Sequence, residues 1–135
     1  FEARRQRQMC IRDRPNTDKD VIKATKDKGM LSFPGVLTPS DCFSAINSGA
    51  DALKISPAFK LGIDGFKAMK AVLPSDVKTY GVGGINENHF HEWLLAGLTG
   101  FGIGSNLFHP SMNDDDIKTT AKKIVTEYDS WFAER

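Results

Sequence analysis

The feature that most constrains the fold of this 135-residue chain is a regular alternation of short apolar runs with amphipathic stretches. Runs typical of strands begin near Met30, Ala52, Val77 and Gly100, which are 22 to 25 residues apart. Each run is followed by a stretch with helical periodicity. Strands that alternate with helical segments in this way are typical of βαβ units with a parallel sheet. The sequence therefore predicts an α/β protein with parallel strands.

Capping residues mark where the helices of this alternation begin. Thr17, Thr38, Asn86 and Asn113 each precede an amphipathic stretch, and their side chains suit the first position of a helix. The residues expected to face inward from the successive helices are Phe43 and Ile46; Phe66, Met69 and Leu73; Phe90, Trp93 and Leu94; and Ile117, Ala121, Ile124, Tyr128 and Trp131.

The composition excludes several classes of protein. With 40% hydrophobic and 26% charged residues, 12 glycines and 6 prolines, the chain is not collagen-like, of low complexity or wholly disordered. It has no apolar run near the roughly 18 residues of a membrane helix. A net charge of +1 gives no reason to expect a nucleic-acid partner. Cys10 and Cys42 form no spacing pattern, which fits a reducing compartment, and we expect a cytoplasmic protein.

The first fourteen residues differ from the rest. They carry five arginines against two acidic residues, which leaves a surplus of acidic residues over basic ones in residues 15–135. We interpret residues 1–14 as a non-native or disordered segment, with a basic arm that contacts anionic partners as the alternative. Residues 15–135 then form the folded part, which is short of the roughly 200 residues of a closed eight-stranded barrel.

A lysine lies inside one of the apolar strands. Strand alternation places Lys54 on the face opposite Leu53 and Ile55 and on the same face as Ser56. Burial of an ammonium ion is costly, so a lysine facing the interior favours the free amine, which can attack a ketone and form a Schiff base. The alternative is a lysine whose stem packs at a sheet edge while its amine reaches solvent.

Two glycine-rich segments follow the next two strands. One contains Gly83 and Gly84 and the other contains Gly104 and Ser105. Glycines between a strand and a helix let backbone N–H groups approach an anion closely, whereas a tight turn is the simpler explanation of either segment alone. Because loops after the last strands of such barrels often bind phosphate, the pair favours a phosphate site.

Other candidates are weaker. His89 and His91 are two residues apart on a predicted helix and point in different directions, and His109 reads as a loop residue. Cys42 is expected to be a small core residue. The acidic run at 114–116 suits the start of a helix rather than a cation site. We expect no metal site.

Taken in order, these motifs resemble the class I aldolases acting on 2-keto-3-deoxy-6-phospho sugar acids, from residue 15 to about residue 110. Residues 15–16 resemble the end of the family's fourth strand, 33–35 its fifth, and 52–57 its Schiff-base strand. Residues 67–76, followed by residues 82–84, look most like the 2-dehydro-3-deoxy-6-phosphogalactonate aldolase branch. The resemblance implies the C-terminal half of a (β/α)8 TIM barrel, namely strands 5–8 with their helices, preceded by the helix after strand 4.

The same resemblance implies roles for the candidate residues. Lys54 would be the nucleophile, Gly83, Gly104 and Ser105 would bind the phosphate end of the substrate, and Gly84 would share that turn. The implied activity is that of a carbon–carbon lyase that releases pyruvate and glyceraldehyde 3-phosphate. It needs no cofactor and no metal. The implied partner is a small phosphorylated sugar acid, without nucleic acid or membrane, and the full-length protein would be a homo-oligomer, a trimer in this family.

Two departures from the family pattern matter. Ser56 stands where the family usually has an aromatic residue, which affects substrate packing. A glutamate and an arginine from the first half of the family's barrel have no counterpart in residues 15–135. We therefore expect these 135 residues alone to be poorly stable and inactive.

Three other functions remain open at this point. One is a 2-dehydro-3-deoxy-6-phosphogluconate or 4-hydroxy-2-oxoglutarate aldolase, and another is a non-catalytic phosphate-binding barrel remnant with a structural Lys54. A metal-dependent sugar-phosphate epimerase is disfavoured because the strand ends carry no His/Asp ligand set.

Overall fold

A computed structural model of the protein describes residues 11–133, and Cys10 therefore lies outside the described residues. In this part of the chain no helix combines the length and the apolar character needed to cross a membrane. The elements in chain order are β1 (Ile11–Asp13), α2 (Lys19–Asp27), β2 (Leu31–Phe33), β3 (Gly35–Val36), α3 (Pro39–Asn47), β4 (Leu53–Ile55), α4 (Ala58–Lys70), β5 (Thr79–Val82), the 3-10 helix η1 (Glu87–His89), α5 (Phe90–Leu95), β6 (Gly100–Gly102) and α6 (Asp114–Ala133).

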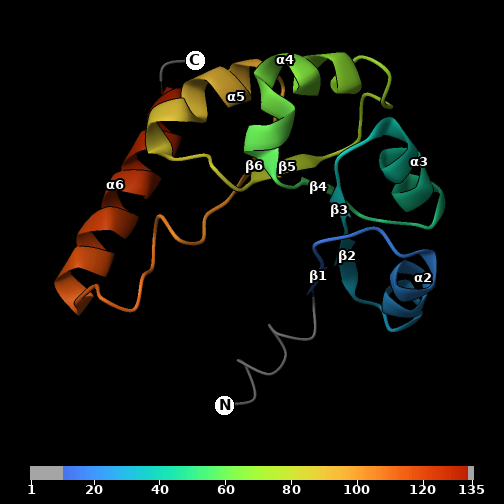
Figure 1. The fold of residues 1–135 in the computed structure, drawn as a ribbon, viewed down its shortest axis with the longest axis horizontal. Helices are drawn as coiled ribbons and strands as arrows, with labels where there is room; N and C mark the ends of the chain where they lie inside the picture. The colour runs from blue at the N-terminus through green and yellow to red at the C-terminus, as the bar shows by residue number, and fades with distance from the viewer. Residues whose placement is uncertain (1–10, 134–135) are drawn as a thin grey trace.

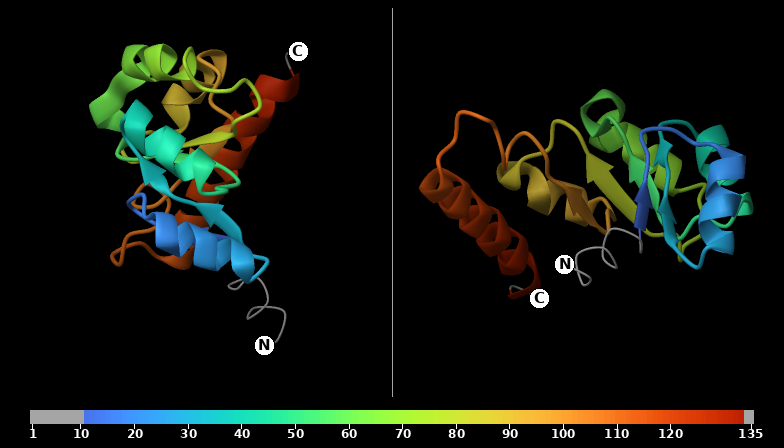
Figure 2. Two further views of the ribbon diagram at one scale, coloured as in Figure 1. Left: turned by 90° about the vertical axis from the view of Figure 1, so that its right-hand side faces the viewer. Right: turned by 90° about the horizontal axis from the view of Figure 1, so that it is seen from below.

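The strands pair in parallel and in the order of the sequence. β1 pairs with β2, and a second ladder runs in the order β3-β4-β5-β6. Pro34 separates β2 from β3 and has no N–H to donate to a ladder. The βα units follow one another in an open arc from α2 to α6, with the strands on its inner side (Figures 1 and 2). The predicted α/β class with parallel strands is confirmed.

Strand β1 forms inside the segment that the sequence separates from the folded part. Its backbone pairs Arg12 with Ser32 and Asp13 with Phe33, and the Arg14 N–H donates to the Phe33 carbonyl at 3.3 Å. Strand β1 therefore lies on the N-terminal side of the boundary placed after Arg14, and that boundary stays a prediction. The charged side chains Arg12 and Asp13 give this segment no apolar strand pattern in the sequence. Only its backbone pairing with β2 identifies it as a strand. Residues 1–10 of that segment lie outside the described residues.

The core lies between the sheet and the helices that follow its strands. Leu53 and Ile55 of β4 are buried, and Phe66 and Met69 of α4 pack in the same core cluster. Cys42 of α3 is also fully buried, with its Sγ 3.5 Å from the Met69 Sδ. Burial, together with the nearby Asp41 charge, raises the pKa of the Cys42 thiol to about 11. Cys42 is thus an inert core residue, as its position in the sequence predicts.

The last two helices pack against β6 through aromatic side chains. Phe90, Trp93 and Leu94 of α5 are buried, as predicted, and the Phe90 ring stacks on that of Phe101 with centroids 4.1 Å apart. α6 contributes half-buried residues, among them Tyr128, but no fully buried one. The C-terminal helix therefore lies on the protein rather than within its core, at one end of the arc (Figure 1).

Asp51 holds the loop before β4 to the start of the sheet. Its carboxylate accepts hydrogen bonds from the Lys26 amine at 2.7 Å and from the Ser32 N–H at 2.7 Å. Burial acts to raise the pKa of Asp51, but these hydrogen bonds outweigh it and hold the pKa below its ordinary value. The carboxylate thus joins α2, β2 and the entry to β4 while it is ionised.

Two local predictions differ from the structure. Asp18, not Thr17, caps α2 and accepts from the Asp20 and Val21 N–H groups, while the Thr17 hydroxyl donates to the Gly35 carbonyl at 2.9 Å. On α3 the buried residues include Cys42 instead of Phe43, which is 39% exposed. At Thr17 a contact to the sheet outweighs the local pattern, and on α3 the buried face is turned toward Met69 of α4.

Replacing Gly35 with alanine should lower the free energy of unfolding by about 1–3 kcal/mol. The added Cβ would meet the Pro15 carbonyl and would lie 2.9 Å from the Arg14 carbonyl oxygen, and both are backbone atoms. Urea denaturation followed by tryptophan fluorescence measures the loss. The matched control is Gly104→Ala, where nothing lies within 4 Å, and it should stay within about 0.5 kcal/mol of the parent chain. Equal effects of the two variants would contradict the close approach of the Arg14 and Pro15 backbone to β3.

Candidate active site

Lys54 lies on β4, one of the two inner strands of the four-stranded ladder. It pairs in register with Gly35 on one side and Tyr80 on the other, and its neighbours Leu53 and Ile55 are buried on the helix side. The side chain of Lys54 therefore projects from the opposite, inner face of the sheet, where 13% of it is exposed. This is the face that strand alternation predicts for it.

The amine of Lys54 is held by a carboxylate from β1. Lys54 Nζ lies 2.5 Å from Asp13 Oδ1, and 62% of the Asp13 side chain is exposed. An amine that is held by a carboxylate has to leave that contact before it can attack a carbonyl group. The lysine therefore meets an opposite charge on the side of β1.

A pocket of about 240 Å³ opens beside this ion pair. Aromatic rings form much of its wall, and Phe33 of β2 and Tyr80 of β5 stack with centroids 5.5 Å apart. An amine at the base of an apolar pocket is an arrangement in which a small carbonyl compound can be bound and attacked by the free-amine form. The residues that line the pocket are Asp13, Phe33, Lys54, Tyr80, Val82, Phe101 and Gly102.

The first glycine segment forms the turn that leaves β5. Gly83 and Gly84 have φ angles of 92° and 73°, values that favour glycine. A Cβ on Gly84 would lie 2.6 Å from the Cβ of Phe59, and the Phe59 N–H donates to the Gly83 carbonyl at 3.1 Å. The turn is therefore packed against the first residues of α4.

The second glycine segment leaves β6. The N–H groups of Leu107 and Phe108 donate to the Gly104 carbonyl at 2.9 and 3.1 Å, which closes a turn around Ser105. A Cβ on Gly104 would meet no atom within 4 Å, and Ser105 is exposed. The turn thus presents Ser105 to solvent.

The structure brings both turns to one edge of the sheet, above the lysine. Lys54 is level with Tyr80 in the ladder, and Gly83 follows Tyr80 by three residues, a rise of about 10 Å along a strand. Both turns follow strands on the side of β4 away from β1. Lys54 and the residues predicted to bind phosphate therefore share the carboxyl edge of one parallel sheet.

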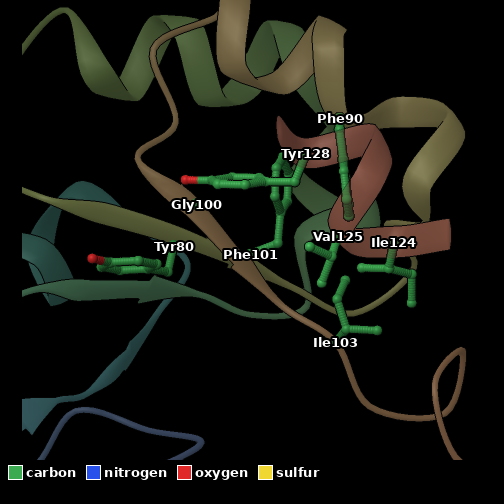
Figure 3. Close-up of a pocket in the computed structure, with 8 residues that line it drawn as sticks. All are labelled: Tyr80, Phe90, Gly100, Phe101, Ile103, Ile124, Val125 and Tyr128. Atoms are coloured by element: carbon green, nitrogen blue, oxygen red, sulfur yellow. The ribbon is translucent and has the colours of Figure 1, made fainter. Parts of the chain in front are cut away.

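A second pocket, of about 270 Å³, lies between β6 and α6. Side chains from both elements, mostly apolar or aromatic, surround it (Figure 3). Tyr80 and Phe101 line this pocket as well as the one beside Lys54. The second pocket carries no charged lining residue, so we assign no chemistry to it.

His91 and His109 contact nearby side chains. His91 Nε2 lies 3.2 Å from the Ser130 hydroxyl and 3.6 Å from the Glu127 carboxylate, which joins α5 to α6. His109 Nδ1 lies 2.8 Å from the Ser111 hydroxyl. Within residues 11–133, no three His, Cys, Asp or Glu side chains gather as metal ligands would.

A lysine on an inner strand face, with glycine turns at the ends of the following parallel strands, defines a partial (β/α)8 barrel with a lysine-centred site. Residues 11–123 match the family described as KDPG and KHG aldolase, and the chain belongs to that family. The predicted family and the predicted barrel class are thus confirmed.

Individual relatives agree with this family. The chain is 39% identical over 116 residues to a probable 2-dehydro-3-deoxy-6-phosphogalactonate aldolase of Rhizobium meliloti (strain 1021), covering 86% of this chain and 55% of the relative. It is 37% identical to the 2-dehydro-3-deoxy-6-phosphogalactonate aldolase of Escherichia coli (strain K12), covering 84% and 56%. A solved structure described as native KDPGal superposes with a TM-score of 0.88 at 34% identity, covering 92% and 60%. The chain spans a little over half the length of the curated relatives it matches.

Sequence reasoning missed two residues of this region. Asp13 falls in residues 1–14, which the sequence separates from the folded part. Its only sequence signal is that it lies two residues before the Pro15-Asn16 pair. Asn106 follows Ser105, and its side chain reaches the turn after β5, where it donates to the Ile85 carbonyl at 3.0 Å. A side-chain contact between two loops leaves no periodic pattern, so the sequence alone did not reveal it.

Asp13→Asn should make Lys54 a few-fold more reactive toward an amine reagent. The substitution removes the carboxylate that holds the Lys54 amine, and because a pair with one exposed partner contributes at most about 1 kcal/mol, the gain in access of the amine to the reagent is limited to a few-fold. Sparse acetylation at one pH, read by mass spectrometry of peptides, gives the ratio of labelling at Lys54 to labelling at Lys26. Lys26 has its own partner in Asp51 and serves as the internal reference. An unchanged ratio would show that Asp13 does not hold the amine in solution.

Proposed function

We propose that the protein is a Schiff-base aldolase that cleaves 2-dehydro-3-deoxy-6-phosphogalactonate to pyruvate and glyceraldehyde 3-phosphate, with Lys54 as the nucleophile. The observation that carries the proposal is the position of Lys54. Its side chain projects from a strand with buried neighbours and lines a mostly apolar pocket, and two glycine turns lie at the carboxyl edge of the same sheet. The printed names of the two curated relatives supply the substrate class.

The proposed chemistry begins with the Lys54 amine. Its lone pair attacks the C2 ketone, and the resulting carbinolamine loses its oxygen as water to give a protonated imine. The C3–C4 bond then breaks, its electron pair moves into an enamine at C2–C3, and the C4 hydroxyl loses its proton to become the aldehyde. Protonation of C3 and hydrolysis of the imine release pyruvate and the free lysine. The positively charged imine accepts the electron pair, so the mechanism assigns no step to a metal.

The two glycine turns are proposed to hold the phosphate. Backbone N–H groups of the turns formed by Gly83 and Gly84 and by Gly104 and Ser105, with the Ser105 hydroxyl, suit a dianionic oxygen cluster. The rise of about 10 Å from the level of Lys54 to the turn after β5 fits a substrate extended between its ketone and its phosphate. Ser56 provides a small side chain where the family usually has an aromatic one.

The residues of this chain account for only part of the proposed reaction. The four-stranded ladder ends at β6, β1 pairs only with β2, and the chain spans 55–56% of the length of the two curated relatives. We propose that imine formation belongs to these residues and that cleavage also requires acid–base groups from the rest of the barrel. The proposed whole protein is a homo-oligomer, and a designed cage made by fusing symmetric oligomeric domains superposes with a TM-score of 0.89 at 34% identity.

Pyruvate and borohydride should form a covalent adduct on Lys54. Reduction fixes the imine as a secondary amine, and peptide mapping by mass spectrometry locates it. Lys54→Ala should abolish the adduct. Lys60→Ala, which removes an exposed lysine beside the glycine turn, should leave it in place. An adduct that survives Lys54→Ala would refute Lys54 as the nucleophile. Binding of a phosphate ester without any adduct in the parent chain would instead favour the non-catalytic phosphate-binding remnant.

The C4-epimeric substrates separate the galactonate assignment from the gluconate one. A chimera joins residues 15–135 to the preceding half of the Rhizobium meliloti relative, so that a complete barrel is present. We expect it to release pyruvate from the 6-phosphogalactonate derivative at least several-fold faster than from the gluconate epimer, measured by a lactate dehydrogenase coupled assay. The same chimera with Lys54→Ala is the control for background. Equal or reversed rates would favour the gluconate aldolase, the activity named for a structural relative at 26% identity.

A further inference from the structure

The two glycine turns leave strands whose backbone pairing ends below them. The register of β5 with β6 runs from Tyr80 and Gly100 to Val82 and Gly102. Gly83 and Ile103 are the first residues beyond the ladder. The distance between the two turns must therefore be set by contacts other than the ladder itself.

A side-chain amide crosses from one turn to the other. Asn106 Nδ2 donates to the Ile85 carbonyl at 3.0 Å. Ile85 is only 4% exposed, with its side chain in the hydrophobic core, so its backbone is a fixed point. On the other side, the turn closed by the Gly104 carbonyl places Asn106 next to Ser105. The amide thus connects an exposed turn to a residue anchored in the core.

The turn after β5 is also fixed in orientation. The Gly83 carbonyl points at the Phe59 N–H, 3.1 Å away. In a trans peptide the N–H of the next residue points opposite to the carbonyl group. The Gly84 N–H is therefore directed away from α4. An anion that receives this N–H and also Ser105 needs the two turns at one fixed separation.

We propose that Asn106 is the positioning residue of the phosphate site, because it holds the turn of Gly104 and Ser105 against the turn of Gly83 and Gly84. Asn106 does not itself contact the ligand. The proposal rests on the proposed function, in that the ligand is the phosphate group of the sugar-acid substrate. Loss of the amide separates the turns and weakens binding of phosphate esters, while the lysine chemistry on β4 is unaffected.

Two substitutions test the role of the Asn106 amide in the full 135-residue chain. Asn106→Ala removes the donor, and Asn106→Asp replaces it with a carboxylate that repels both the Ile85 carbonyl and a phosphate. Titration calorimetry with glycerol 3-phosphate measures binding, and glycerol is the uncharged comparison ligand. We expect at least about fivefold weaker binding for Asn106→Ala and a larger loss for Asn106→Asp. Asn88→Ala changes an exposed asparagine outside the two turns and serves as the matched control.

Borohydride trapping of pyruvate on Lys54 is the second readout, and it should proceed in both Asn106 variants as in the parent chain. Unchanged glycerol 3-phosphate binding by Asn106→Ala would overturn the inference and leave the proposed function standing. Parallel loss of binding and trapping would also overturn it, because Asn106 would then support the fold in general. Absence of glycerol 3-phosphate binding by the parent chain, with pyruvate trapping intact, would refute the phosphate site itself. Absence of pyruvate trapping in the parent chain would count against the proposed aldolase function.

Discussion

The parallel register through β4 is the constraint on which the rest of the structure depends. Leu53 and Ile55 are buried against the helices, so Lys54, between them, has to project to the other face. Hydrophobic burial of two neighbours thus places a charged group that would otherwise avoid the interior of the fold. A shift of β4 by one residue would move Lys54 into the core and expose both apolar neighbours, which makes the register strongly specified.

The same logic explains how much of the molecule the sequence predicts. Four strands, the capping box at Thr38 and the face of Lys54 follow from periodicity and capping, which are local properties. Strand β1 does not, because Arg12 and Asp13 are exposed and its pairing is made by backbone atoms. The cap of α2 also escaped prediction. Thr17 has the right chemistry for a cap but donates its hydroxyl to the Gly35 carbonyl, a residue 18 positions away.

The residues of the candidate site also fall into those that the sequence reveals and those that it does not. Lys54 and the glycines are visible in the sequence because each is unusual for its place in a strand or turn. Asp13 and Asn106 are ordinary polar residues whose importance comes only from what they touch. The contacts that set distances in the site are therefore those that a single sequence hides. The two turns are recognisable as motifs, but their separation depends on one amide and on the anchored backbone of Ile85.

The strand order also places the Asp13 carboxylate and the two glycine turns on different sides of Lys54. Asp13 comes from β1, on one side of β4, while the glycine turns follow β5 and β6 on the other side. A substrate extended from Lys54 toward the turns would cross β5 and would not have to displace the carboxylate along its length. Asp13 competes only for the amine itself. The proposed binding of phosphate and the proposed imine formation therefore depend on different parts of this half-barrel. The first depends on the loops beyond the ladder, and the second on release of Lys54 from the carboxylate of Asp13.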